Sequence, residues 1–155
     1  RHHVMVATVT GVAPFVSMLR YALAMPETSA QFYVLQGASF IDEFGYDAEL
    51  AELAAKHSNV RFVPTCSRPQ EPRNAGWRGE TERVNTIVEK HVRDWGLQPA
   101  ETCVYVCGNP QMIEDVKTRY AHTGFRVEAE GFWKNPERAR GRRRNPDVTA
   151  SGPER

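Results

Sequence analysis

The sequence has no long hydrophobic run. Its 155 residues contain no apolar stretch that approaches the roughly 18 to 20 residues needed to span a bilayer. It has no internal repeat, and Arg1, His2 and His3 lead into an apolar run too short for a secretory signal peptide. These absences predict a soluble protein with no membrane partner. An initiating Met is also missing, so we expect the chain to be a fragment of a longer protein.

Cysteine is scarce, and its placement argues against disulfides and metal sites. The three cysteines, Cys66, Cys103 and Cys107, cannot all pair, and no two of them have the C-x-x-C spacing of redox or zinc sites. The five histidines are scattered without ligand spacing. We therefore expect no metal, and a reducing compartment such as the cytoplasm.

Charge is nearly balanced, with 20 basic and 19 acidic side chains, but it is unevenly distributed. Residues 134–155 hold seven basic and three acidic residues, three prolines and a single aliphatic residue larger than alanine. Such a segment cannot bury a core, so we predict a disordered basic tail after a domain over residues 1–133. The tail has no aromatic residue to stack on bases, which favours a solvated end over a nucleic-acid patch.

Apolar runs of strand length alternate with helical patterns before the tail. Between the runs, apolar residues recur at helical spacing, for example at Val84, Val88 and Val92. Five strands and four helices over about 133 residues predict an α/β domain with an open, mostly parallel five-stranded sheet and helices on both faces. The strands are predicted at 3–9, 31–36, 60–66, 102–107 and about 126–133.

Two turns follow predicted strands and could meet at one place. The turn at 10–14 offers backbone N–H groups, the Thr10 hydroxyl and a helix N-terminus, all of which favour phosphate. The turn at 107–110 begins with Cys107. If the first strand is central and the fourth lies beside it, both turns flank the crevice where such sheets bind ligands. The alternatives are an ordinary strand-to-helix turn and a small buried apolar cysteine.

Four separated motifs are together similar to one family. They are V-A-T-V-T-G-V-A-P-F-V-S-M-L-R at 6–20, T-C-S-R at 65–68, G-E-T-E-R-V-N at 79–85 and V-C-G-N-P-Q-M-I-E-D at 106–115. In order and spacing they resemble the pyridine-nucleotide domain of the ferredoxin:NADP reductase family. The resemblance implies a five-stranded parallel sheet that binds NAD(P)H and follows an FAD-binding β-barrel. It also implies hydride transfer between NADPH and FAD, with ferredoxin, flavodoxin or another electron-transfer protein as partner.

We expect this barrel to be absent, because the chain starts at the first strand of the nucleotide domain. The isolated chain should then hold nucleotide at most, and should be inactive without the FAD domain. The alternative function is a non-catalytic nucleotide- or partner-binding module derived from the family. Such a module would dock its partner through residues 67–82 or through the basic tail.

The resemblance also implies which residues bind the nucleotide. It assigns Ser67, Arg68 and Arg83 to the 2′-phosphate, which favours NADP over NAD because a hydroxyl and two guanidinium groups suit a phosphate. The chain departs from the family pattern at Val9 and Glu82, where relatives commonly have glycine. The pyrophosphate and nicotinamide side is assigned to the first loop, at Thr10, Gly11, Val12, Ala13 and Pro14.

The remaining assignments concern the nicotinamide and the flavin. Cys107 resembles the cysteine that contacts the nicotinamide ring, and Glu130 resembles a carboxylate that assists proton or hydride alignment. Trp133 or Phe132 would stack on the flavin, unless both only complete the last strand. The wall beside the nicotinamide is assigned to Gly108, Asn109, Pro110 and Met112.

Overall fold

The computed structural model describes residues 1–26 and 28–130, which fold as one parallel sheet covered by helices. Every neighbouring pair of strands runs parallel, in the order β3-β2-β1-β4-β5. The predicted open five-stranded sheet is thus confirmed, with the first strand at its centre. The strands are β1 (His2–Thr8), β2 (Gln31–Ala38), β3 (Val60–Cys66), β4 (Thr102–Cys107) and β5 (Arg126–Glu130).

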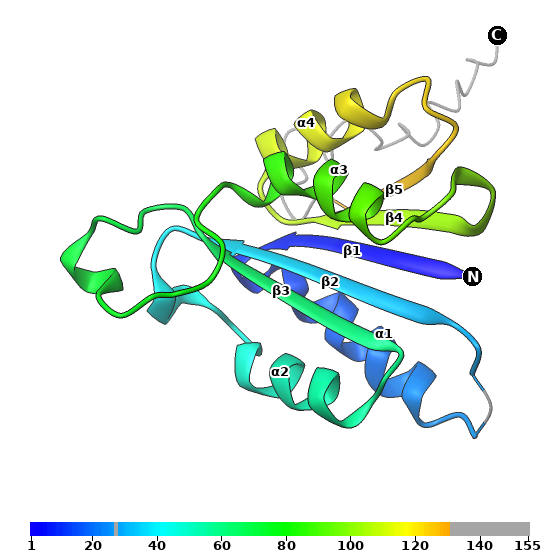
Figure 1. Ribbon diagram of the computed structural model, residues 1–155, viewed down its shortest axis with the longest axis horizontal. Coiled ribbons are helices and arrows are strands. Elements are labelled where there is room, and N and C mark those ends of the chain that lie inside the picture. Colours follow the sequence, from blue (N-terminus) through cyan, green and yellow to red (C-terminus); the bar gives the residue numbers. More distant parts are fainter. Residues whose placement is uncertain (27, 131–155) are drawn as a thin grey trace, which may run out of the picture.

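Two helices cover each face of the sheet (Figure 1). On one face lie α1 (Ala13–Leu23) and α2 (Asp47–Lys56), and on the other lie α3 (Val84–Asp94) and α4 (Pro110–Tyr120). The helices change from one face of the sheet to the other after β3. The reason is that α3 connects β3, at one edge of the sheet, to β4 on the other side of β1, so this connection runs in the opposite direction to the two before it. The short 3-10 turns are η1 (Val9–Val12), η2 (Ile41–Glu43), η3 (Pro72–Asn74) and η4 (Pro99–Glu101).

The two faces divide the apolar residues of each strand between two cores. In β1, Val4 and Val6 join the cluster under α3 and α4, while Met5 and Ala7 join the cluster under α1 and α2. Successive residues of a strand point to opposite faces, so a strand covered on both sides needs apolar residues at every position. This requirement explains the continuous apolar runs that predicted the strands.

Three strand boundaries differ from the sequence prediction, and part of the predicted last strand falls beyond the described residues. The first strand spans His2–Thr8 rather than 3–9, because Val9 begins the turn η1, and the second strand continues to Ala38 rather than ending at residue 36. The last strand is described to Glu130, so residues 131–133 and the predicted basic tail at 134–155 lie outside the described residues. In the described part of the chain, no helix is long and apolar enough to cross a membrane.

The hydroxyl of Tyr120 gives a test of this packing. Tyr120 is buried at the end of α4, packs edge-to-face on Phe125, and its hydroxyl has no hydrogen-bond partner among the described residues. Burial accordingly raises the pKa of this phenol. Because a buried polar group without a partner is costly, Tyr120→Phe should raise the free energy of unfolding by about 1 kcal/mol in urea denaturation.

Tyr105→Phe is the matched control for this prediction. The Tyr105 hydroxyl pairs with His3 Nδ1 at 3.2 Å, so its removal should lower the free energy of unfolding by about 1 kcal/mol. A loss of stability in Tyr120→Phe would contradict the prediction and indicate a hydrogen-bond partner for that hydroxyl.

Candidate functional site

The loops that follow β1 and β4 touch each other. The backbone N–H of Asn109 donates a hydrogen bond of 2.8 Å to the Thr8 hydroxyl. A Cβ on Gly11 would lie 2.6 Å from the Cys107 carbonyl oxygen and 2.8 Å from the Gly108 Cα. The predicted meeting of these two turns is therefore confirmed. Only a residue without a side chain allows them to approach this closely at position 11.

The turn after β1 contains a strained valine. Val9 has a φ of +47°, in the left-handed region that β-branched residues rarely adopt. Its carbonyl accepts a hydrogen bond of 2.9 Å from Gln36 Nε2, and the same nitrogen donates to the Gly45 carbonyl at 2.9 Å. Gln36 is completely buried. The buried amide thus connects the turn to the segment after β2 and holds Val9 in this conformation.

A cleft of about 770 Å³ opens at the carboxyl ends of the strands, beside the first turns of α3 and α4. It is bordered by the ends of β1, β2 and β3 and by these two helices. Thr8 and Val9 reach it, but residues 10–14 do not line it. Five of the residues assigned from the sequence line this cleft together: Ser67, Arg68, Arg83, Asn109 and Met112.

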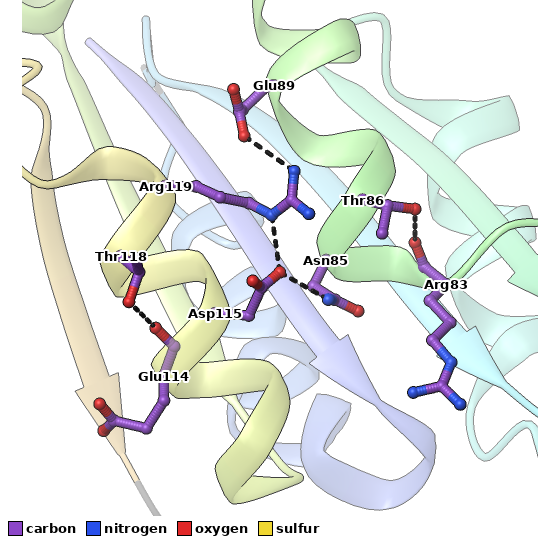
Figure 2. A network of polar contacts seen from close by, with 8 residues as sticks. All are labelled: Arg83, Asn85, Thr86, Glu89, Glu114, Asp115, Thr118 and Arg119. Atoms are coloured by element: carbon purple, nitrogen blue, oxygen red, sulfur yellow. Dashed lines mark hydrogen bonds and ion pairs between the residues drawn. The ribbon is translucent and has the colours of Figure 1, made fainter.

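The cations of this cleft are not neutralised by carboxylates. Neither Arg68 nor Arg83 forms an ion pair or side-chain hydrogen bond with any described residue, and Arg68 lies over the Phe40 ring at 5.4 Å. By contrast, Arg73 in the same connection is paired with Asp42 at 2.7 Å. Figure 2 shows the Arg83 guanidinium extending away from the other polar groups. Two exposed guanidinium groups are therefore available to an anion.

Of the two glutamates beside these arginines, only one faces the cleft. Glu80 is turned toward α3, where its carboxylate lies 2.9 Å from His91 Nε2. Glu82, which replaces the glycine of the family pattern, lines the cleft and is exposed. Its carboxylate can therefore turn into solvent when an anion binds.

Asn74 holds the segment that carries Ser67 and Arg68. It is 1% exposed, and its Nδ2 donates to the carbonyls of Ser39 at 2.9 Å and of Arg68 at 2.7 Å. Its Oδ1 accepts a hydrogen bond of 2.8 Å from the Ile41 backbone N–H. One buried side chain thus joins the segments that follow β2 and β3 at the rim of the cleft.

A polar network lies where α3 and α4 meet the cleft (Figure 2). Asp115 Oδ2 accepts hydrogen bonds of 2.6 Å from Asn85 Nδ2 and 2.6 Å from Arg119 Nε. These two donors, Asn85 first, hold the pKa of the Asp115 carboxyl below its usual value. Arg119 Nη1 also contacts Glu89 Oε1 at 3.1 Å. The network fixes the two helices relative to each other.

Cys107 and Pro14 line a second, less polar pocket of about 450 Å³, together with Tyr105 and Arg126. Cys107 itself is buried at the end of β4. Glu130 ends β5 and is the register partner of Cys107. The structure therefore brings Cys107 and Pro14 together, in a pocket that shares no lining residue with the cleft of Ser67 and Arg68.

The remaining assigned residues take different positions. Thr10 is exposed and lines neither pocket, and Val12 is fully buried in the core under α1, so its side chain cannot reach a ligand. Ala13 is half-buried, and Pro110 is exposed at the start of α4. Asn109 caps α4, because its Oδ1 accepts from the Gln111 and Met112 backbone N–H groups at 2.8 and 3.4 Å. Trp133 lies outside the described residues.

Sequence reasoning missed several residues of the cleft or its border. Thr8, Asn85 and Asp115 line the cleft, and Asn74 supports it. Thr8, Asn85 and Asp115 each lie within one of the quoted motifs, and this position was the one signal available for them. Asn74 lies in a polar connection, where nothing in the sequence distinguishes it from a solvated residue.

The sheet is parallel, and its cleft lies at the carboxyl ends of the strands, next to the point where strand order reverses. Together with the two arginines that can bind an anion there, this arrangement defines an α/β nucleotide-binding domain. The chain belongs to the oxidoreductase NAD-binding domain family, whose sequence profile matches residues 5–118. It is similar to the nucleotide-binding domains of ferredoxin–NADP and cytochrome b5 reductases.

Individual relatives agree with this assignment. The chain is 32% identical over 114 residues to ferredoxin–NADP reductase B of Sorangium cellulosum, across 72% of this chain and 45% of that protein. It is 27% identical over 116 residues to NADH-cytochrome b5 reductase 2 of Gallus gallus, across 74% of this chain and 36% of that protein. The chain thus spans less than half the length of either curated relative.

A solved structure shows the same fold. A ferredoxin NADP+ reductase from Neisseria gonorrhoeae, with bound FAD and NADP, superposes with a TM-score of 0.62 at 23% identity. The match covers 85% of this chain and 56% of that chain.

Gly11 provides a test of the contact between the two loops. Gly11→Ala would place a Cβ against backbone atoms of Cys107 and Gly108, which cannot move aside as a flexible side chain can. We expect a loss of about 1 to 3 kcal/mol in the free energy of unfolding, measured by chemical denaturation.

Gly45→Ala is the matched control, because its Cβ would meet only Thr10 Cγ2 at 3.8 Å and its φ is not left-handed. This substitution should be neutral or stabilise the protein by a few tenths of a kcal/mol. Equal effects of the two substitutions would contradict the steric argument.

Proposed function

We propose that this chain is the NADPH-binding half of an FAD-dependent oxidoreductase that exchanges electrons with ferredoxin, flavodoxin or another electron-transfer protein. The observation that carries the nucleotide preference is the pair of unneutralised arginines, Arg68 and Arg83, beside Ser67 at the cleft. One relative is named for NADP and the other for NADH, so this choice depends on the cleft itself.

The 2′-phosphate of NADP suits these three side chains. A phosphate offers only acceptor oxygens, and the planar guanidinium groups of Arg68 and Arg83 supply paired donors. The Ser67 hydroxyl, half-buried in the cleft, adds a neutral donor. Charge-assisted hydrogen bonds contribute about 1.5 to 3 kcal/mol each, enough to distinguish a phosphate from the 2′-hydroxyl of NAD. The Asn74 hydrogen bonds support this role, because they fix the backbone of Arg68.

We assign the nicotinamide end to the second pocket, where Cys107 and Pro14 meet. In the complete protein, bound FAD would exchange a hydride with the nicotinamide. The contribution of this chain is to orient the nicotinamide through Cys107, which lines this pocket, and through the adjoining residues 108–110. Glu130, the register partner of Cys107, is proposed to assist alignment at the same end.

The face beside this pocket fits the remainder of a longer protein. Met18, Tyr21 and Met25 are large apolar residues that α1 and its end leave 39%, 72% and 46% exposed. Met18 also lines the second pocket. Because the chain spans 45% of its ferredoxin reductase relative, we propose that a flavin-binding domain covers this face.

The first test measures nucleotide preference. Arg68→Ala should weaken NADP binding by about tenfold or more and leave NAD binding nearly unchanged, because only the former loses a charge-assisted bond. Isothermal titration calorimetry with both nucleotides measures this difference.

Arg93→Ala is the matched control, since it removes the same charge from an exposed position near the far end of α3. It should affect both nucleotides little. Equal losses for NADP and NAD in Arg68→Ala would refute the assignment of the 2′-phosphate.

The second test concerns the nicotinamide end and requires the flavin-containing protein. Cys107→Ala should slow hydride transfer in stopped-flow measurements while the nucleotide dissociation constant stays nearly the same. This pattern is expected of a group that acts mainly in the transition state. A changed dissociation constant with an unchanged rate would assign Cys107 to ground-state binding instead.

A further inference from the structure

Two acceptor groups in the cleft have no role in the phosphate site. Asn85 and Asp115 both line the cleft, and Asn85 lies two residues after Arg83. Figure 2 shows Asn85 between Arg83 and Asp115, with its nitrogen directed to the Asp115 carboxylate. The Asn85 oxygen is thereby turned away from Asp115.

Both residues keep one oxygen available for a ligand. The hydrogen bonds of Asp115 with Asn85 and Arg119 use only Oδ2. Among the described residues, neither Asp115 Oδ1 nor Asn85 Oδ1 accepts a hydrogen bond. An ionised carboxylate is an acceptor only, and an amide whose nitrogen is engaged presents its oxygen. This part of the cleft therefore offers two acceptor oxygens that no described residue occupies.

Two unoccupied acceptor oxygens suit a ligand that brings hydrogen-bond donors. The phosphates of a dinucleotide carry none and are repelled by a carboxylate, whereas the exocyclic amine of adenine carries two N–H groups. The adenine and the 2′-phosphate are attached to adjacent carbons of one ribose. A phosphate held by Arg83, which immediately precedes α3, therefore brings the base near Asn85 in the first turn of that helix.

We propose that Asn85 and Asp115 bind the exocyclic amine of adenine and make the cleft selective for adenine over hypoxanthine dinucleotides. This inference rests on the proposed NADPH site and specifies its base. Arg119 and Glu89 have a positioning role, because they hold the Asp115 carboxylate at the cleft.

The test compares NADP with its hypoxanthine analogue, which has a carbonyl oxygen in place of the amine and a hydrogen on the neighbouring ring nitrogen N1. The unmodified protein should bind the analogue about tenfold more weakly, because the carbonyl meets acceptors. Asp115→Asn keeps an oxygen for Asn85 and Arg119 and puts an amide nitrogen in place of the available oxygen. It should weaken NADP binding and strengthen binding of the analogue, so that the preference falls at least tenfold or inverts.

Asn85→Ala is the second variant, and it should reduce the preference for adenine without inverting it. Glu114→Gln is the matched control, since it removes the same charge from the neighbouring residue of α4, whose side chain is 74% exposed and points away from the network. This control should leave the ratio of the two dissociation constants unchanged.

The outcomes separate this inference from the proposed function. If Asp115→Asn weakens both dinucleotides by the same factor, the carboxylate acts through helix packing or a ribose hydroxyl, and the inference is overturned. If the unmodified protein binds both dinucleotides equally but still prefers NADP to NAD, only the base assignment fails. If it binds none of them, the proposed function itself fails.

Discussion

The contact between the ends of β1 and β4 is the constraint on which the site depends. In a parallel sheet that winds in both directions from a central strand, the connections on the two sides diverge and leave a crevice. Here the crevice is fixed by the hydrogen bond from Asn109 to Thr8 and by the close approach at Gly11. The first bond orients the start of α4, because Asn109 is also its cap. The position of the polar residues on α4 follows from that capped start.

The ends of the strands lie between two pockets of different polarity, and one dinucleotide would occupy both. On the α3 and α4 side, the cleft is polar and contains Arg68 and Arg83 without acidic partners. The other pocket is bordered by Pro14 and Cys107 and is less polar. The net charge of +1 gives no indication of an anion site. The local arrangement does, because Arg68 and Arg83 are the two described arginines that line the cleft, and neither is paired with a carboxylate.

The sequence predicted the fold well, because burial on both faces leaves a strong pattern in the strands. Pro14 and Pro110 lie in the first turns of α1 and α4, where a proline loses no helical hydrogen bond. The turn at Val9 could not be predicted. Its left-handed conformation depends on Gln36, which lies 27 residues away in another strand. An apolar residue at the end of an apolar run is normally predicted to continue the strand. Only knowledge of the tertiary contact with Gln36 would have indicated a turn at Val9.

The site was only partly predictable. Ser67, Arg68 and Arg83 were found because short motifs carry them, and the structure brings them to one cleft. Asn85 and Asp115 lie on helix surfaces, where polar residues are usually solvated, and only the packing of α3 against α4 turns them toward the cleft. Val12 shows the opposite error, since a residue inside a binding motif can serve the core alone.

The central position of β1 also has a consequence for folding order. Its pairing with β2 joins segments close in sequence, whereas the bond from Asn109 to Thr8 closes a loop with a separation of 101 residues. Contacts of such long separation are costly in chain entropy and tend to form late. The seam between β1 and β4 is therefore expected to close after the two halves of the sheet have formed. A dinucleotide that contacts both strand ends would stabilise the contact between β1 and β4, which forms last, and would slow its opening.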